Sequence, residues 1–317
     1  MVLCSEAVAL FALAVVLAAP VPAALGRAQW PARDPRVALV CWQAVGLAGG
    51  LSLLGGALTL AASGSSGQWL PAVTTLPQRW SRLGIAGWTG LALVALVGTW
   101  LVVTAVRSTL RVVMARREHR ARLDAVADHL SGRVLQGGGS SPLSSSRLAF
   151  SDLRLLDSPN AVAYCVPGLR PRLVVSQGAL DALDPAEFDA VLAHEQVHAR
   201  GRHDLLLQPF LAWRQAFPFL PTAATALRAV QLLIEMLADD GACQLCGPAS
   251  LSSALRRLGA KQLSLGIANA GEVRYELDQR TTRLCTPVRS LTLATRMALY
   301  LAAVTLVVLP PAILVLM

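Results

Sequence analysis

Charged residues are scarce in this sequence. Asp, Glu, Lys and Arg make up 15% of its 317 residues, whereas a soluble globular domain carries about 25%. Hydrophobic residues make up 54%, which argues against both a wholly soluble protein and a disordered one. Cysteine is scarce too, with six residues, so a disulfide scaffold is excluded. The net charge is +9, but no zinc finger or aromatic RNA-binding platform accompanies it, and we expect no direct binding to nucleic acid.

The hydrophobic residues are concentrated in four stretches without a charged residue, each about long enough to cross a bilayer as a helix. The predicted spans are residues 7–25, 37–62, 84–106 and 297–317. Glu6 precedes the first span where a secretory signal would have basic residues, so we expect a retained helix. The second span has four small residues, which favour close contact with another span. These are Gly46, Gly50, Ser52 and Gly56.

The basic residues predict the orientation of the spans. Six Arg residues follow the third span against two acidic residues, a bias that marks the cytoplasmic side of a membrane. They are Arg107, Arg111, Arg116, Arg117, Arg120 and Arg122. We therefore expect a multi-pass protein of the plasma membrane whose middle region is cytosolic and whose two termini are extracytoplasmic. Membrane lipid is an expected partner, since the Arg residues lie beside anionic headgroups.

The sequence predicts a mainly α protein in three parts. They are three spans within residues 1–106, a cytosolic α+β domain in residues 107–296, and a last span in residues 297–317. Residues 136–147 (QGGGSSPLSSSR) form a predicted Gly/Ser-rich linker. The short β-prone runs Asn160–Val166 and Arg172–Ser176 lie on either side of Pro167-Gly168 and predict a hairpin.

A helix is predicted to begin after Asp184, because Pro185 suits a first turn and Glu187 suits a capping box. This helix carries His194-Glu195-Gln196-Val197-His198, an HExxH motif, and should end near Gly201. Histidines four residues apart lie on one face of a helix, so both imidazoles can bind one Zn²⁺. Glu195 then lies close enough to the open position of the metal to take a proton from water.

A zinc site of this kind needs a third protein ligand, and the sequence offers two. Asp204 continues the motif as HExxHxxGxxD, close to the short-spacer metzincin pattern with Asp in place of the final His. Glu235 lies 37 residues beyond His198, a gap that accommodates a chain reversal and a second helix returning past the metal. His203 has no predicted role, and we expect it to be exposed after the end of the helix.

The HExxH motif followed by Glu235-x-x-Ala-Asp239 resembles the membrane-embedded gluzincins, which include the HtpX and CAAX prenyl protease groups. The chain looks most similar to the BlaR/MecR antirepressor metallopeptidase family, in which three spans precede the protease domain and one follows it. Three upstream segments extend that resemblance. They are Pro159-Asn160-Ala161, Pro167-Gly168-Leu169-Arg170-Pro171 and Val174-Val175-Ser176.

The resemblance implies a zincin-type metalloprotease domain with a small β-sheet and an HExxH active-site helix. It implies His194, His198 and Glu235 as the Zn²⁺ ligands and Glu195 as the general base. Asp239, one turn beyond Glu235, would orient a ligand imidazole. Asp204 would then cap the next helix or brace the site.

The expected reaction is peptide-bond hydrolysis. The substrate would lie extended beside an edge strand, whose free backbone groups pair with it. Either predicted strand can supply this edge, so the candidate substrate-binding residues come from both. They are Asn160, Ala161, Val174 and Val175.

The resemblance to BlaR/MecR implies a regulatory protease that cleaves a cytosolic transcriptional repressor of the BlaI/MecI kind in an antibiotic or cell-wall stress response. In that family the last span leads to a penicillin-binding sensor domain, whereas this sequence ends at Met317 without an SxxK motif in an external domain. We therefore expect the signal to come through the spans or from a partner. The expected partners include a second copy of the chain or a separate sensor. The alternative hypotheses are an HtpX-like quality-control protease and a non-catalytic membrane receptor.

Overall fold

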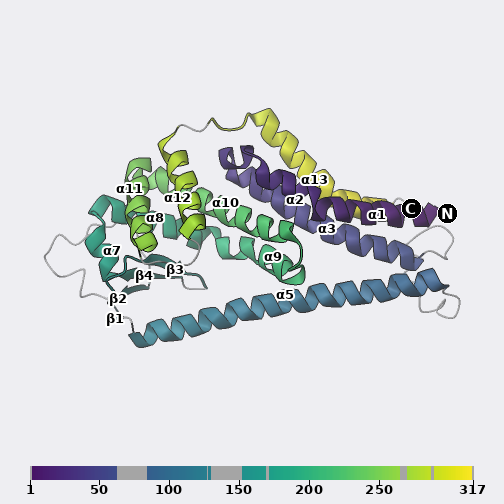
Figure 1. The fold of residues 1–317 in the computed structure, drawn as a ribbon, viewed down its shortest axis with the longest axis horizontal. Helices are drawn as coiled ribbons and strands as arrows, with labels where there is room; N and C mark the ends of the chain where they lie inside the picture. Colours follow the sequence, from purple (N-terminus) through teal and green to yellow (C-terminus); the bar gives the residue numbers. More distant parts are fainter. Residues whose placement is uncertain are drawn as a thin grey trace. The chain divides into compact units, whose positions relative to one another are not determined.

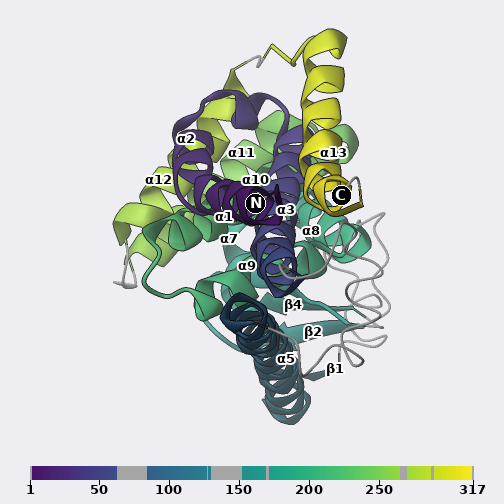
Figure 2. The ribbon, with the colours of Figure 1, turned by 90° about the vertical axis from the view of Figure 1, so that its right-hand side faces the viewer.

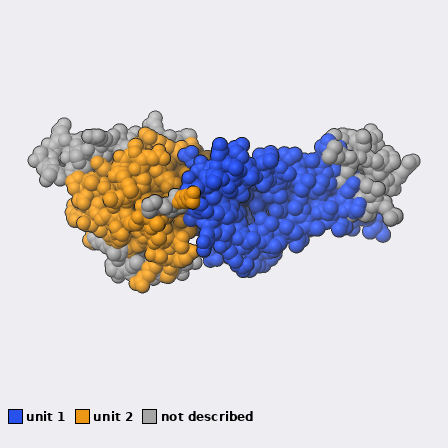
Figure 3. Space-filling view, turned by 90° about the horizontal axis from the view of Figure 1, so that it is seen from above, with its two compact units in different colours: residues 1–109, 208–231, 290–317 blue, residues 110–207, 232–289 orange. Residues whose placement is uncertain are grey.

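The computed structural model of the chain describes seven stretches of residues. They are residues 2–62, 84–126, 128–129, 152–168, 171–264, 270–286 and 289–315. The predicted linker at 136–147 lies outside the described residues. Close packing divides the chain into two units (Figure 3): unit 1 comprises residues 1–109, 208–231 and 290–317, and unit 2 comprises residues 110–207 and 232–289.

Unit 1 is built of helices. They are α1 (Val2–Ala18), α2 (Pro20–Arg27), the short η1 (Trp30–Arg33), α3 (Pro35–Ala62), the first part of α5 (Ile85–Val126) and α13 (Leu293–Val315). Among the described residues, four helical segments are long and apolar enough to cross a membrane, in the places that the sequence predicts. The third helix continues 20 residues beyond the predicted span, because residues 107–126 contain neither Gly nor Pro to interrupt it.

The first span is broken where α1 gives way to α2. Pro22 has no backbone N–H, so the carbonyl of Ala18, four residues earlier, loses its helical hydrogen-bond partner. The hydroxyl of Thr222 donates to this carbonyl at 2.6 Å. A bilayer offers no water to satisfy a free carbonyl, so this contact permits the break within an apolar segment.

Within unit 1, α3 packs against both α1 and α13 (Figures 1 and 2). Glycine permits the close approach: a Cβ atom at Gly56 would lie 3.0 Å from the ring of Phe11, and one at Gly55 would lie 3.3 Å from Leu314. The predicted small-residue contact is therefore present at the end of α3. At Gly46 and Gly50 a Cβ would meet no described atom within 4 Å.

An ion pair joins the beginnings of α3 and α13. Asp34 caps α3, since the N–H of Val37 donates to its Oδ1 at 3.4 Å. The other carboxylate oxygen, Oδ2, lies 2.5 Å from Nε of Arg296. The two helices therefore begin on the same side of unit 1, as the alternating topology expected from the sequence requires.

Unit 2 contains a four-stranded sheet in the order β1-β2-β4-β3. Its strands are β1 (Asp128–His129), β2 (Leu153–Leu156), β3 (Ala163–Val166) and β4 (Arg172–Ser176). β4 pairs in parallel with β2 and antiparallel with β3, with Ala163 opposite Val175 and Cys165 opposite Leu173. The predicted hairpin is therefore formed, although Leu169 and Arg170 in its turn lie outside the described residues.

The sheet corrects the expectation for the substrate-binding edge. β4 pairs on both sides, so Val174 and Val175 have no free backbone groups to offer; both side chains are buried. Within the described part of the sheet, β3 is the edge strand on this side. Asn160 and Ala161 precede it: the carbonyl of Asn160 accepts from Ser176, and Ala161 lies in the core. The edge therefore begins at Ala163.

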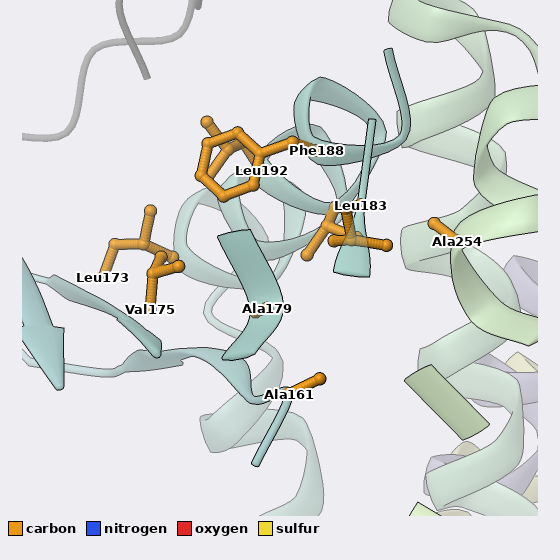
Figure 4. Packing of buried hydrophobic residues seen from close by; sticks show 9 residues of the cluster. Ala161, Leu173, Val175, Ala179, Leu183, Phe188, Leu192 and Ala254 are labelled. Atoms are coloured by element: carbon orange, nitrogen blue, oxygen red, sulfur yellow. The ribbon is translucent and has the colours of Figure 1, made fainter. Parts of the chain in front are cut away.

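The helices α7 (Gln177–Ala182), α8 (Pro185–Gly201), α11 (Pro248–Ser264) and α12 (Ala270–Cys285) belong to unit 2. The main core cluster joins β4 to α8 through Leu173, Val175, Phe188 and Leu192 (Figure 4). Their burial fixes α8 against the sheet.

Two further helices, α9 (His203–Ala216) and α10 (Pro221–Cys246), contribute residues to both units. Their residues 208–231 pack with unit 1, whereas the sequence places them within the soluble region. The indole N–H of Trp100, on α5, donates to the carbonyl of Ala216 at 3.2 Å.

Candidate metal centre

Local contacts fix both ends of the helix that carries the HExxH motif. Asp184 Oδ1 accepts from the N–H of Glu187 at 2.9 Å, and Glu187 Oε2 accepts from the N–H of Asp184 at 3.0 Å. This is the predicted capping box. At the other end, α8 stops at Gly201, and Arg202 adopts a left-handed conformation with φ of 48°.

Three side chains converge on one point in unit 2. The Nε2 atoms of His194 and His198 lie 3.0 Å apart, and the two carboxylate oxygens of Glu235 lie 3.3 Å and 3.4 Å from them. A tetrahedral Zn²⁺ site with bonds of about 2.0–2.1 Å separates its ligand atoms by about 3.3 Å. The three residues therefore fit a zinc ion without rearrangement, and the structure brings Glu235 rather than Asp204 to the two histidines.

A buried ion network lies behind His194. Oδ1 of Asp239, one turn beyond Glu235 on α10, lies 3.0 Å from Nδ1 of His194. Arg280 on α12 donates to both oxygens of Asp239, at 2.9 Å and 2.7 Å, and lies 3.1 Å from Glu235. Burial alone would raise the pKa of Asp239, but its contacts with Arg280 and His194 lower it below the ordinary value. Asp239 is therefore a carboxylate that can orient the ligand imidazole.

The protonation of His194 follows from the same network. Burial lowers its pKa, but the neighbouring carboxylates of Asp239 and Glu235 outweigh burial and raise the pKa to about 9. A metal ion at Nε2 would replace that proton. Arg280 was not predicted, because it lies 41 residues beyond Asp239 and no spacing rule connects the two positions.

The position of His203 contradicts the prediction that this residue is exposed after the end of the helix. Its side chain is buried rather than exposed, and its Nδ1 lies 3.0 Å from Nδ1 of His198. Gly201 makes room for it, since a Cβ there would lie 2.5 Å from the ring. Burial, and then the charge on His198, lower the pKa of His203 to about 4. A neutral His203 can accept the Nδ1 proton of His198 and leave Nε2 of His198 free for a metal.

Glu195 faces the edge strand. Its Oε2 accepts the backbone N–H of Cys165 at 2.9 Å. Burial raises its pKa above the ordinary value, while His194, His198 and this N–H act in the opposite direction. Ser176 donates its N–H to the carbonyl of Val162, so alternation along β3 directs the backbone groups of Cys165 away from β4. The free edge of β3 is thus directed toward Glu195.

The Asp204 carboxylate and the cysteine thiols do not take part in this arrangement. Asp204 is in the first turn of α9, where Arg116 donates to its Oδ2 at 2.9 Å. Burial and Glu195 raise the pKa of the Cys165 thiol to about 12, and burial raises that of Cys243 to about 11. Both thiols therefore stay neutral, and the Cys243/Cys246 pair packs against a hydrophobic cluster.

Comparison with known proteins adds one finding. Residues 144–226 match Peptidase family M48. Peptidases of this family are zinc metallopeptidases, which agrees with the geometry of the three converging side chains. The match includes α8 and ends before Glu235, so the third ligand rests on the structure and not on the match. No curated protein and no solved structure matches the chain.

Proposed function

We propose that the chain is an integral-membrane zinc endopeptidase whose unit 2 acts on proteins in the cytosol. The convergence of His194, His198 and Glu235 at zinc-ligand separations, with Glu195 on the same helix, carries this proposal. The four apolar segments and the M48 match support it. The Arg residues that follow the third span favour a cytosolic unit 2, with both termini extracytoplasmic.

The mechanism assigns a task to each residue of the site. Zinc, when bound, supplies a Lewis acid that polarises the scissile carbonyl and lowers the pKa of water toward neutrality. Glu195 takes the proton of the attacking water and passes it to the leaving amine. Its raised pKa favours this exchange, because a base whose pKa approaches the working pH both accepts and returns a proton readily. Asp239 and His203 hold the two imidazoles in orientation.

The substrate would pair with the edge of β3. The backbone groups of Ala163 and Cys165 alternate with those bonded to β4, so they face the open edge of the strand. The N–H of Cys165 donates to Glu195, which leaves the groups of Ala163 and the carbonyl of Cys165 to meet an extended peptide. This places a bound peptide beside Glu195, which the N–H of Cys165 already contacts. We therefore assign substrate binding to Ala163–Val166 in place of the earlier candidates.

The proposed substrate is a cytosolic repressor of the BlaI/MecI kind. The resemblance of the HExxH and Glu235-x-x-Ala-Asp239 segments to BlaR/MecR supports this, as does the order of three spans, soluble domain and last span. A second candidate is quality control of membrane proteins as in HtpX, with which the M48 match agrees equally well.

Comparing Glu195→Ala with the wild type tests the function. Cleaved cytosolic and membrane proteins are identified in cells that express either form, with Glu118→Ala, an exposed change on α5, as the control. We expect Glu195→Ala to keep zinc and lose cleavage. A single repressor-like target supports the regulatory role, and many misfolded membrane proteins support quality control. Full signalling by Glu195→Ala would instead support the non-catalytic receptor.

A further inference from the structure

The hairpin formed by α9 and α10 packs with the spans, a feature that the proposed peptidase activity does not explain. Residues 208–231, which we call the hairpin segment, belong to unit 1, while the beginning of α9 and the end of α10 belong to unit 2. Between Leu205 and Leu227 the sequence has one charged residue, Arg214, and most of the others are apolar. The hairpin segment is therefore suited to apolar surroundings.

Two contacts place the hairpin segment beside the middle of the first two spans. A Cβ on Gly49 would lie 3.9 Å from the ring of Trp213, and Gly49 is in the middle of the second span. Thr222 donates to the carbonyl of Ala18, which is close to the middle of the first span. The hydrocarbon core of a bilayer is about 30 Å thick, so about ten residues on either side of the middle of a spanning helix lie within it.

A third contact joins the hairpin segment to α5. The indole N–H of Trp100 donates to the carbonyl of Ala216 at 3.2 Å. Trp100 is about five residues from the middle of the third span. Side chains of a helix lean toward its N-terminus, which for Trp100 is the direction of that middle. Three spans therefore meet the hairpin segment at the depth of the hydrocarbon core.

The contacts along α10 show the direction in which this helix leaves the core. Thr222, in its first turn, meets Ala18 near the middle of the first span. Thr225, almost one turn later, lies against Gly26, since a Cβ there would be 2.7 Å from Cγ2 of Thr225. Gly26 is next to Arg27, the charged residue that ends this span. The tip of the hairpin is therefore its deepest part.

The turn between α9 and α10 meets the condition that a bilayer sets for non-helical backbone. At this depth each polar backbone group needs a partner within the protein. Pro218 and Pro221 have no N–H to satisfy. Five carbonyls of the turn accept hydrogen bonds from the protein: Ala216 from Trp100, Phe217 from the N–H of Leu220, Pro218 from Arg214, Leu220 from the N–H of Ala223, and Pro221 from the hydroxyl of Thr225.

Arg214 is compatible with this position. Its guanidinium donates to the carbonyl of Pro218 at 3.1 Å. Charged side chains within a membrane are rare, and they commonly pair with a backbone carbonyl. The charge of Arg214 thus stabilises the turn.

We propose that α9 and α10 form a re-entrant hairpin, which enters the bilayer on the side of Arg107, where α5 continues into unit 2, and returns to the same side. Both helices continue into unit 2, and α9 is about 20 Å long, too short to cross the hydrocarbon core. Phe219, at the tip, is 74% exposed and lies among acyl chains. The partner of this surface is the hydrocarbon of the membrane, so the proposal does not depend on peptide hydrolysis.

Photolabelling from within the membrane tests the proposal on the full wild-type chain. The vesicles consist of phosphatidylethanolamine and phosphatidylglycerol and contain a phospholipid with a diazirine at the end of one acyl chain. After irradiation, mass spectrometry maps the labelled residues. We expect label at Phe219 and at Leu301, an exposed residue of α13, and none at Tyr275, an exposed residue of α12. Label in the spans without label in the hairpin segment would overturn the proposal.

A second measurement determines whether water reaches the tip. Phe219→Cys is treated with a water-soluble maleimide in open membrane fragments, and mass spectrometry separates its reaction from those of the native cysteines. Tyr275→Cys is the control for an aqueous position and Leu301→Cys the control for a position in lipid. We expect Phe219→Cys to react about tenfold or more slowly than Tyr275→Cys, because hydrocarbon contains no water, and to resemble Leu301→Cys.

Two outcomes of this measurement would overturn the proposal. A rapid reaction of Phe219→Cys would place the tip in water. A slow reaction without photolabel at Phe219 in the wild type would show that a second copy of the chain or another protein covers the tip in place of lipid. All three substituted positions are exposed, so the variants should fold as the wild type does.

Discussion

The two units satisfy their buried polar groups in different ways. In unit 1, buried hydroxyls bond to backbone carbonyls of their own helix: Ser52 donates to Ala48 at 2.7 Å and Thr59 to Gly55 at 2.9 Å. In unit 2, buried charges bond to one another, as Arg280 does to Asp239. Apart from the ion pair of Asp34 with Arg296 where α3 and α13 begin, the described interior of unit 1 is therefore nearly free of charge, whereas unit 2 concentrates charge around one point.

This difference follows from the surroundings and the task of each unit. Within a bilayer a polar group must find its partner inside the protein, and a neutral local hydrogen bond is the least costly solution. A zinc site requires carboxylates and oriented imidazoles away from water, so each buried charge needs an opposite charge nearby. Removing a buried ion pair in unit 2 should therefore lower the free energy of unfolding more than removing a neutral hydrogen bond in unit 1.

The largest effect is expected from Arg280→Ala. This change removes the guanidinium that pairs with both Asp239 and Glu235 and leaves them only the imidazole of His194. Breaking a buried pair in this way costs about 3–5 kcal/mol. We expect the free energy of unfolding of unit 2 in the zinc-depleted chain to fall by this amount, measured by chemical denaturation in detergent.

Arg283→Ala on the same helix is the control for this prediction. Arg283 pairs with Asp240, whose side chain is 39% exposed. Pairs that reach solvent contribute about 1 kcal/mol or less. Similar losses from the two variants would contradict the view that burial distinguishes the Arg280 network.

His203→Ala should have the next largest effect. It removes the imidazole that holds Nδ1 of His198, and loss of such a contact weakens metal binding about 10- to 100-fold. Competition with a zinc chelator measures the affinity. His203→Asn retains an acceptor and should recover part of it, whereas His119→Ala, at an exposed histidine that contacts Tyr164, should leave it unchanged. If His203→Ala binds zinc as tightly as the wild type, His203 packs against His198 without orienting it for the metal.

The same contrast separates what the sequence could predict from what it could not. The spans follow from composition, and α8 follows from local contacts between Asp184, Glu187 and the residues near Gly201, so both were predicted. The end of the third span was placed at residue 106, although α5 continues to Val126, because composition marks the end of the apolar stretch rather than the end of the helix.

Contacts between residues far apart in the sequence could not be predicted from it. The two β-prone runs look alike, and only the parallel pairing of β4 with β2 makes β3 the edge. The burial of His203 depends on the left-handed turn at Arg202 and on the missing Cβ of Gly201. Arg280 reaches Asp239 through the packing of α12, which no local pattern encodes.

Thr222→Val should have a small effect, because it interrupts a neutral contact in unit 1. The variant leaves the carbonyl of Ala18 without its donor at the break in the first span. Side-chain hydrogen bonds in membrane proteins contribute about 0.6 kcal/mol on average. Thermal unfolding in detergent should show a slight loss, and Thr225→Val, which removes a hydroxyl bonded within α10, should show less. If Thr222→Val lowered the stability as much as Arg280→Ala, the neutral hydrogen bonds of unit 1 would matter as much as the buried ion pairs of unit 2, contrary to our view.

The smallest effect on metal binding is expected from Asp204→Ala. Asp204 is charged and close in sequence to the HExxH motif, but Arg116 holds its carboxylate, and Glu235 takes the third position beside the histidines. The variant should still bind one zinc per chain by elemental analysis, while Glu235→Ala should lose it. If Asp204→Ala loses zinc and Glu235→Ala keeps it, Asp204 is the third ligand, as the short-spacer metzincin pattern predicts. The carboxylates of unit 2 that bind zinc or orient its ligands are therefore those of the buried network, and not those closest in sequence to the HExxH motif.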